Sequence, residues 1–351
     1  MEDQHRSRRK DEHITLAYGQ FDEGMTSFAD VRFVPQPIPH FHTNSVSLQT
    51  EFANQRFELP FYINAMTGGS TRTKQVNQSL AIIARETGIA MAVGSQSAAL
   101  QDPDMIDTYS IVRKENPTGK IFANLSANNS VDNARKAVEM LEANALQIHI
   151  NVAQELVMKE GDRDFSNWLE AIQQIVALHE FPVIVKEVGF GMSRELMEQL
   201  QNVGVKTLDV GGKGGTNFAK IESDRRRDGA YRYLEDWGLT TAESLLDCQN
   251  SSGEILASGG IKTPLDIVKC LALGAKSVGI SGVVLHQLKR TDVETTIQML
   301  QNWQGELRSI MTLLGAKGIP ELAQKAILIE GDLKHFAKLR HVPTDHLANR
   351  T

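Results

Sequence analysis

The sequence predicts an α/β fold, a (β/α)8 TIM barrel with an N-terminal arm and a C-terminal helical tail. Eight short runs rich in β-branched residues recur along the chain, and an amphipathic stretch follows each of them. The runs are apolar without alternation, which is typical of parallel strands covered on both faces. Eight such units close a barrel. A doubly wound open sheet is the alternative that the same pattern allows.

The expected strands follow one another at regular spacing. They begin at residues 61, 89, 121, 146, 183, 206, 254 and 276, and they read FYINAM, IAMAV, IFANL, LQIHI, VIVKEV, KTLDV, EILAS and KSVGI. Between them, apolar residues at the helical period, such as Leu169, Ile172 and Val176, predict helices that cover the sheet. Thr263-Pro264 is a helix start signal. Helix ends are expected at Gly88, Asn144, Gly204 and Gly274.

Two segments, one at each end of the chain, fall outside this repeat, although residues 1–351 are expected to form a single domain. Residues 1–58 form the arm, in which VSLQTEFANQRFEL predicts a hairpin, and residues 59–290 form the barrel core. Residues 291–351 are expected to be helical. The stretch from Gly211 to Gly238 is too long for a simple connection, so we expect a structureless lid that becomes ordered when a ligand binds.

Composition excludes several classes of protein. The 351 residues are 41% apolar and carry a formal net charge of −6, which argues against a nucleic-acid binder. No apolar run is long enough to span a membrane, and the charged N-terminus does not resemble a signal peptide. Cys248 and Cys270 lack the spacing of a metal site or a disulfide framework. The expectation is a cytoplasmic protein that acts on a small molecule.

Polar residues gather where the expected strands end, which is where barrel enzymes place their active sites. The glycines that follow strands seven and eight are Gly259, Gly260 and Gly282. They could bring backbone N–H groups to a phosphate. The glycines after either strand alone could simply form a tight turn. The other members of this ring are Asn64, Met66, Thr67, Ser95, Gln96, Asn124, Asn151, Gln154, Glu155, Lys186, Glu187 and Thr216.

Four charged or polar features of this ring and of the arm remain ambiguous from the residues alone. Lys186 could form a Schiff base, pair with an anionic ligand or pair with Glu187. His149 shares a strand face with Asn151, and a functional role is favoured over a core histidine. Glu155, a single carboxylate, suits a Mg²⁺ that substrate phosphates complete, or else only a hydrogen-bonding role. The arm sequence RSRRKDEH could be a solvated tail or could contact a phosphorylated ligand.

Together these stretches resemble the FMN-dependent type 2 isopentenyl-diphosphate isomerases. The resemblance rests on RKDEHI, PFYINAMTGGS, VGSQS, HINVAQE, VIVKEVGFGMS, GGKGGTNFAKIE, SGGIKTPLDIVKCLALGAK and GISG, in this order from about residue 8 to residue 285. It implies reversible isomerisation of isopentenyl diphosphate to dimethylallyl diphosphate in isoprenoid biosynthesis. It also implies reduced FMN, NADPH as its reductant, Mg²⁺ and a homo-oligomer, a tetramer or octamer.

The resemblance also implies roles for individual residues. Gln154, Lys186 and His149 are the expected catalytic residues, and Glu155 the metal ligand. FMN is expected to contact Ala65, Met66, Thr67, Ser95, Asn124, Lys186, Thr216, Gly259, Gly260, Ile261, Ser281 and Gly282. The substrate is expected to contact Arg9, Lys10, His13, Ser95, Gln96, Ser97, His149, Asn151 and Gln154.

Two points qualify this implied site. Some members of the family carry Arg where this chain has Ser97, which shifts more of the expected diphosphate contact to Arg9 and Lys10. No carboxylic acid in the ring stands out as the proton donor, so the working hypothesis gives the proton transfers to reduced FMN, assisted by Gln154. The alternatives are an FMN-dependent 2-hydroxy-acid oxidase and a non-catalytic flavin-binding barrel. An oxidase would need a His and an Arg that strand seven, ending in SGGI, does not supply.

Overall fold

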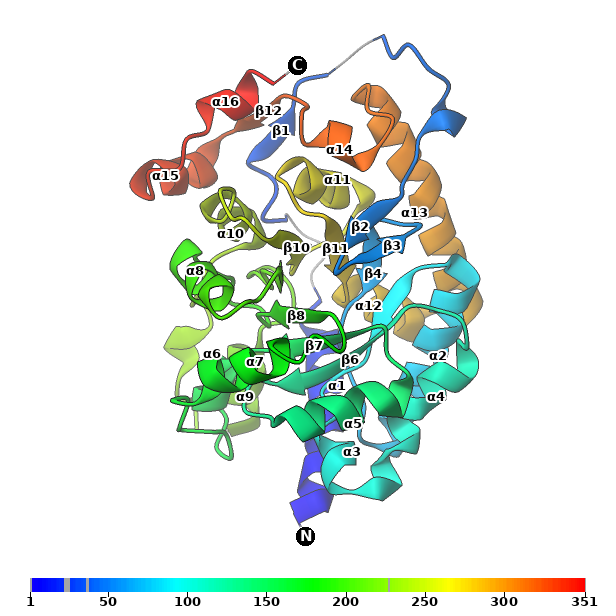
Figure 1. Ribbon diagram of the computed structural model, residues 1–351, viewed down its shortest axis with the longest axis vertical. Coiled ribbons are helices and arrows are strands. Elements are labelled where there is room, and N and C mark those ends of the chain that lie inside the picture. Colours follow the sequence, from blue (N-terminus) through cyan, green and yellow to red (C-terminus); the bar gives the residue numbers. More distant parts are fainter. Residues whose placement is uncertain (1, 22–25, 36–37, 227, 351) are drawn as a thin grey trace.

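Eight parallel strands close into the expected barrel (Figure 1). The structure is a computed structural model that describes residues 2–21, 26–35, 38–226 and 228–350, with side chains from residue 9 onward. The last strand pairs with the first, with Val278 opposite Phe61, so an open sheet is ruled out. The strands are β4 (Phe61–Ile63), β5 (Ala90–Ala92), β6 (Ile121–Ser126), β7 (Ala145–His149), β8 (Val183–Lys186), β9 (Thr207–Asp209), β10 (Glu254–Ser258) and β11 (Ser277–Ile280).

Helices surround the barrel and bury their apolar faces against it. Thr263 begins one of them with a capping box followed by Pro264, as the sequence predicts. The surrounding helices are α2 (Thr71–Thr87), α3 (Ser97–Gln101), α4 (Asp107–Glu115), α5 (Val131–Leu141), α6 (Val152–Val157), α7 (Trp168–Val176), α8 (Arg194–Asn202), α10 (Thr241–Asp247), α11 (Pro264–Ala272), α12 (Gly282–Arg290) and α13 (Val293–Leu313). None of the helices in the described part of the chain could cross a membrane.

The expected hairpin seals the amino-terminal mouth of the barrel. Strands β2 (Thr50–Phe52) and β3 (Gln55–Phe57) are antiparallel, and Ala53 and Asn54 between them both have positive φ, as a tight primed turn requires. Phe52 and Phe57 stack at 4.0 Å, and both rings meet Phe122 edge-on inside the barrel. Because aromatic rings fill this end, a ligand can enter only from the other one.

The first part of the N-terminal arm forms a helix and is not a solvated tail. Helix α1 (Glu2–Gly19) lies across the carboxyl-terminal mouth, and its last turns pack on α12, where Tyr18 and Phe21 stack on His286. Asp11 accepts a hydrogen bond of 2.7 Å from the Ser70 hydroxyl at the start of α2. These contacts make α1 one wall of the space above the barrel.

The tail contains a strand that the sequence pattern does not reveal. Strand β12 (Ile327–Ile329) pairs with β1 (Val31–Phe33) of the arm, and Figure 1 shows the two beside the last helices. Beyond this sheet, Arg340 donates hydrogen bonds to the buried carboxylate of Asp247 on α10. The other tail helices are α14 (Ile319–Leu322), α15 (Gly331–Leu339) and α16 (Asp345–Ala348), and a 3-10 turn, η1 (Thr43–Ser45), lies in the arm.

The stretch between Gly211 and Gly238 is more regular than expected. It holds the helix α9 (Phe218–Arg226) and the 3-10 turn η3 (Arg232–Leu234), so the expectation of a structureless segment is wrong for its described residues. Helix α9 packs beside α6, and a further 3-10 turn, η2 (Pro103–Met105), precedes α4. Helix α9 therefore forms a second wall of the space above the barrel.

Candidate active site

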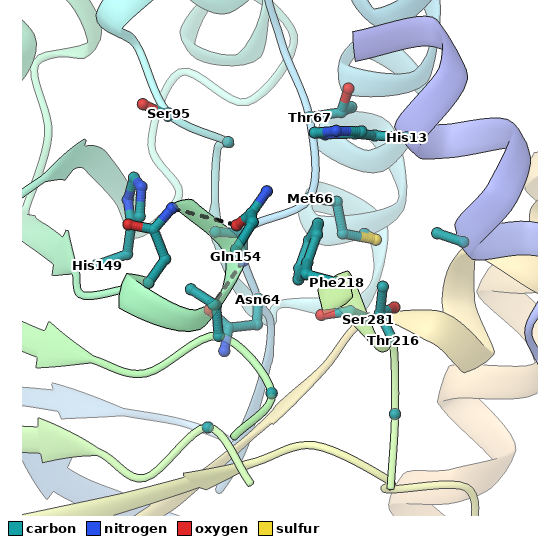
Figure 2. A pocket seen from close by; sticks show the side chains of 18 of the residues that line it. His13, Asn64, Met66, Thr67, Ser95, His149, Gln154, Thr216, Phe218 and Ser281 are labelled. Carbon is teal, nitrogen blue, oxygen red and sulfur yellow. Dashed lines mark hydrogen bonds between the residues drawn. The ribbon is translucent and has the colours of Figure 1, made fainter. Parts of the chain in front are cut away.

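A large cavity of about 1300 Å³ opens at the carboxyl-terminal ends of the strands. Residues that follow all eight barrel strands line it, and α1 and α9 complete its walls. Figure 2 shows side chains from these elements pointing into the same space. The predicted site residues that line it are Arg9, Lys10, His13, Ala65, Met66, Thr67, Ser95, Ser97, Asn124, His149, Asn151, Gln154, Glu155, Lys186, Thr216, Gly259, Gly260, Ile261, Ser281 and Gly282.

Gln96 is the one predicted site residue that the structure turns away from the cavity. Its side chain is completely buried and donates to the backbone oxygen of Ala137 on α5 at 2.9 Å. Its own oxygen accepts the backbone N–H of Asn124 at 2.9 Å. Both ends of the amide are therefore used between barrel and helix, and the structure does not bring the Gln96 side chain to the cavity.

Glycines at the ends of β9, β10 and β11 form a cradle that side chains would fill. A Cβ on Gly259 would lie 1.9 Å from the Gly212 oxygen, and one on Gly215 would lie 2.9 Å from the Gly260 nitrogen. Gly259 and Gly260 have φ of +101° and +73°, which other residues adopt only with strain. Helix α12 begins at Gly282 beside them. Exposed backbone N–H groups and a helix start suit a phosphate group.

Lys186 brings a buried positive charge to the barrel mouth. Its side chain is only 6% exposed, and its Nζ donates to the backbone oxygen of Glu187 at 2.6 Å, not to the Glu187 carboxylate. That carboxylate accepts three backbone N–H groups of the following turn at 2.5–2.7 Å. Burial lowers the pKa of Lys186, while the charges of Asp209 and Glu187 act against this shift. The simple ion pair with Glu187 is therefore not what the structure shows.

Asp209 is a buried carboxylate that the sequence analysis overlooked. It ends β9 inside the barrel and accepts hydrogen bonds from Tyr62 at 2.9 Å, Asn64 at 2.8 Å and Ser258 at 2.7 Å. Burial, and then the charge of Asp209, raises the pKa of Tyr62 well above its usual value. Asp209 thus ties β4 and β10 to β9 and supplies a negative charge that opposes the lowering of the Lys186 pKa.

A chain of neutral polar groups fixes His149. Its Nδ1 lies 2.9 Å from the Asn124 oxygen, the Asn124 amide donates to Gln147, and the Gln147 amide donates to Asn64. Burial, together with the charges of Lys186 and Lys10, lowers the pKa of His149 to about 3. The imidazole is therefore neutral at pH 7. Because the Asn124 oxygen can only accept, Nδ1 carries the proton and Nε2 remains an acceptor.

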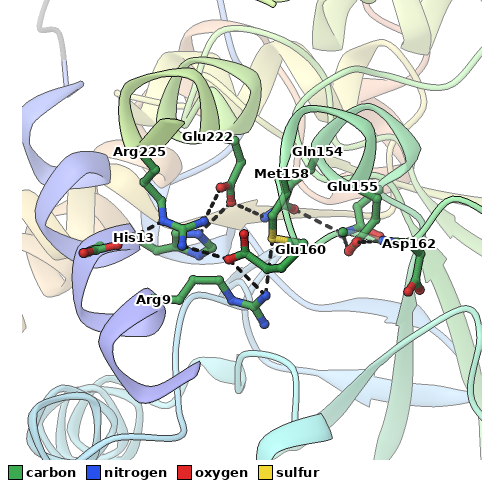
Figure 3. Close-up of polar contacts among 12 residues, drawn as sticks. Arg9, His13, Gln154, Glu155, Met158, Glu160, Asp162, Glu222 and Arg225 are labelled. Atoms are coloured by element: carbon green, nitrogen blue, oxygen red, sulfur yellow. Dashed lines mark hydrogen bonds and ion pairs between the residues drawn. The ribbon is translucent and has the colours of Figure 1, made fainter. Parts of the chain in front are cut away.

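Glu222 of α9 is a second carboxylate that the sequence analysis overlooked. It is completely buried, and its Oε1 lies 2.7 Å from His13 Nε2 and 3.5 Å from the Gln154 amide nitrogen. Arg225 pairs with its other oxygen (Figure 3). Burial alone would raise the pKa of Glu222, but the His13 hydrogen bond and the neighbouring charges lower it. The only signal in the sequence is its place at the end of the GGKGGTNFAKIE motif.

Gln154 is held at both ends of its amide. Its oxygen accepts from Asn151 Nδ2 at 3.2 Å, while its nitrogen points toward Glu222. The side chain is 8% exposed, on a wall of the cavity. Figure 2 places it between His149 and Phe218. The amide can therefore hold one orientation toward a ligand.

The residues around Glu155 fit a weakly held metal ion. Asn151 Nδ2 and the backbone N–H of Asp162 each donate to Glu155 at 2.8 Å, so an acidic neighbour that the sequence did not predict lies beside it. Asn151 Oδ1 is buried and has no partner among the described residues. Burial raises the pKa of Glu155. No cluster of three or more His, Cys, Asp or Glu that could hold a metal ion occurs in the described residues.

Lys10 contributes a half-buried cation to the cavity. Burial, and then the charge of Arg9, lowers its pKa to about 8. Below pH 8 the ammonium is present and favours an anion, and above pH 8 it is lost. The described part of the arm thus presents Lys10 and Arg9 to the same cavity, while the side chains of residues 1–8 lie outside the description.

This pKa predicts that anion binding weakens as the pH rises. Between pH 7 and pH 9.5, the affinity of wild-type protein for pyrophosphate should fall, by up to about tenfold per pH unit above pH 8. Lys10→Gln should bind more weakly at pH 7 and lose this slope. Calorimetric titration of both proteins at each pH provides the measurement, and their difference cancels the titration of the ligand itself. Parallel slopes for the two proteins would show that Lys10 is not the titrating group.

Comparison with known proteins shows which family this chain matches. The model of the FMN-dependent dehydrogenase family matches residues 104–329. Among solved structures, a mandelate oxidase variant with a monooxide FMN adduct shares the fold, with a TM-score of 0.61 at 17% identity over 91% of this chain and 92% of the other.

Curated relatives are similar over nearly the whole chain. An isopentenyl-diphosphate delta-isomerase of Listeria monocytogenes is 50% identical over 349 residues, covering 98% of both chains. One of Latilactobacillus sakei is 51% identical over 340 residues, covering 96% of this chain and 97% of the relative. One of Staphylococcus aureus is 48% identical over 342 residues, covering 97% and 98%. The chain therefore belongs to the isopentenyl-diphosphate delta-isomerase family, and with it to the isomerases.

Proposed function

We propose that the protein interconverts isopentenyl diphosphate and dimethylallyl diphosphate, using reduced FMN and Mg²⁺, in isoprenoid biosynthesis. The observation that carries this proposal is one cavity lined both by a glycine cradle with the buried Lys186 and by Arg9, Lys10 and the Glu155 carboxylate. We assign the cradle and Lys186 to one end of the ligand site, and Arg9, Lys10 and Glu155 to the other. Such a cavity suits a flavin phosphate and a second anionic ligand with its metal.

The first end would hold FMN. Backbone N–H groups around Gly259, Gly260 and Gly282 would bind its phosphate, and Ser281 and Ile261 would flank it. Thr67 supports this placement, because its hydroxyl is buried without a partner among the described residues and lines the cavity. Lys186 would offset negative charge on the reduced ring. The remaining contacts would come from Ala65, Met66, Ser95, Asn124 and Thr216.

The second end would hold the diphosphate and its metal. Arg9 and Lys10 would contact phosphate oxygens, and Ser97 would border them. Glu155 would bind Mg²⁺ directly, with the unpartnered oxygen of Asn151 as a further acceptor for the ion or its water. His13 and His149 would contact the ligand as neutral groups, because the pKa of each is lowered by burial first and by nearby cations.

The reaction moves a proton onto one alkene carbon and removes one from an allylic carbon. Reduced FMN would supply ring nitrogens able to exchange protons beside the alkene. Gln154, fixed by Asn151 and Glu222, would orient the prenyl chain toward that ring. Phe218 lines the same wall and lies edge-on to His13 at 5.9 Å, so an apolar tail would meet an apolar surface there.

Other parts of the proposal concern the setting of the reaction. NADPH would reduce the flavin, although the net reaction transfers no electrons. The protein would work in the cytoplasm as a homo-oligomer, a tetramer or octamer.

Turnover by the reduced holoprotein tests the function. Protein loaded with FMN, reduced anaerobically and given Mg²⁺ should convert isopentenyl diphosphate to a mixture with dimethylallyl diphosphate, whose two methyl signals appear in the proton NMR spectrum. Oxidised protein and protein with EDTA should show no conversion. If the reduced protein gave none either, the isomerase proposal would be overturned. Peroxide formation from a 2-hydroxy acid would instead support an oxidase.

A further inference from the structure

Arg9 is incompletely paired although it lies in a largely buried position. Its side chain is 22% exposed, and Nη1 donates at 3.3 Å to the sulfur of Met158, a weak acceptor. The nearest carboxylate oxygen, Glu160 Oε1, is 3.8 Å away. The Nε of Arg9 is buried without a partner among the described residues. The guanidinium therefore retains unused donors at the rim of the cavity (Figure 3).

Glu160 has a closer cation than Arg9. The same Oε1 lies 2.9 Å from Arg225 NH2, and Arg225 also pairs with Glu12 and Glu222. Glu160 therefore keeps an ion pair with Arg225 when Arg9 moves away. Arg9 by contrast gains from moving, because a phosphate offers it two short charge-assisted bonds in place of one long ion pair.

We infer that Glu160 is the resting counter-ion of Arg9 and competes with the diphosphate for it. The inference rests on the proposed function, because it needs a diphosphate in this cavity. When the ligand binds, Arg9 exchanges Glu160 for phosphate oxygens, and Glu160 remains on Arg225. When the ligand leaves, Glu160 takes Arg9 back.

This competition serves release of the product. Substrate and product carry the same diphosphate, so a clamp that held one tightly would hold the other equally tightly. A resting counter-ion weakens the binding of substrate and of product by the same factor, and it speeds the departure of the product. Glu160 is thus a positioning residue that sets the grip of Arg9 without touching the reacting carbons.

Removing the charge of Glu160 should therefore tighten binding. With Mg²⁺ present, calorimetric titration of full-length Glu160→Gln with inorganic pyrophosphate should give a Kd about three- to fivefold lower than wild type, the scale of a partly exposed ion pair. The gain should shrink in high salt. With isopentenyl diphosphate, KM should fall by a similar factor while kcat falls or stays constant, because product release becomes slower.

Two matched controls separate this competition from a general charge effect. Glu235→Gln removes a carboxylate that lines the same cavity but is not the one paired with Arg9, so its Kd should change less than twofold. In an Arg9→Gln background, Glu160→Gln should no longer tighten binding, because the competition needs both partners.

The outcomes distinguish this inference from the proposed function. An unchanged or higher Kd in Glu160→Gln, or the same gain with and without Arg9, would overturn the inference while the function stands. If wild-type protein failed to bind pyrophosphate at all, the diphosphate site would be absent, and both the inference and the proposed function would be overturned.

Discussion

Replacing Lys186 by Met should lower kcat/KM by about 100- to 1000-fold, the scale of one preorganised charge or donor in an active site. Lys186 is buried at the mouth of the barrel, where the charge of Asp209 opposes the lowering of its pKa by burial. Methionine keeps the length of the side chain and removes the charge. The bound flavin should then become harder to reduce, because its anionic reduced form loses a neighbouring cation.

Two measurements check this expectation, and one variant controls it. Isomer formation gives kcat/KM, and anaerobic titration against redox dyes gives the flavin potential, which should become more negative. Lys206→Met is the control, because Lys206 is exposed just before β9, at the opposite end of the barrel. A Lys186→Met protein with an unchanged potential and near-normal kcat/KM would remove Lys186 from the proposed site.

The second large effect is expected from Gly259→Ala. The new Cβ would lie 1.9 Å from the Gly212 oxygen at a φ of +101°, so the β9 and β10 loops would have to separate. Loss of two charge-assisted hydrogen bonds to the phosphate, at roughly 1.5 kcal/mol each, would weaken FMN binding by more than about 100-fold. Quenching of FMN fluorescence during titration of the apoprotein measures this affinity.

Gly274→Ala is the control that separates the effect of backbone strain from the loss of FMN binding. Gly274 has nearly the same φ, +107°, but nothing lies within 4 Å of its added Cβ, and it precedes β11 on the other side of the barrel from the cavity. Both variants should lose about 1–3 kcal/mol of unfolding free energy from backbone strain. Only Gly259→Ala should lose FMN. If both retained normal FMN affinity, the cradle would not be a phosphate site.

The barrel could be predicted because its signals are local. Strand runs, the capping signal at Thr263 and the positive φ of Gly88 follow from short stretches of sequence. Asn144 shows the limit of such reasoning. Glu142, not Asn144, adopts the left-handed conformation after α5, and the Asn144 side chain instead accepts the backbone N–H of Ile121. The Asn144 amide thus bonds to the start of the neighbouring strand β6, and the local sequence pattern does not indicate this contact.

The site could be predicted only in part, because side-chain direction and distant contacts decide it. Ser95, Gln96 and Ser97 are consecutive where the chain passes from β5 to α3, yet the middle side chain enters the helix layer while the other two line the cavity. Asp209 and Glu222 gain their importance from partners on other elements, 147 residues away for Tyr62 and 209 for His13. Such distances leave no local trace in a sequence.

The pairing of β1 with β12 has a consequence for the order in which a newly synthesised chain matures. Residues 31–33 emerge early from a ribosome, yet their partner strand follows almost three hundred residues later. Strand β1 therefore stays without its partner until the whole barrel, which closes with β11 at Ser277–Ile280, has been synthesised. The contact between the arm and the tail is thus a late event in the maturation of the polypeptide.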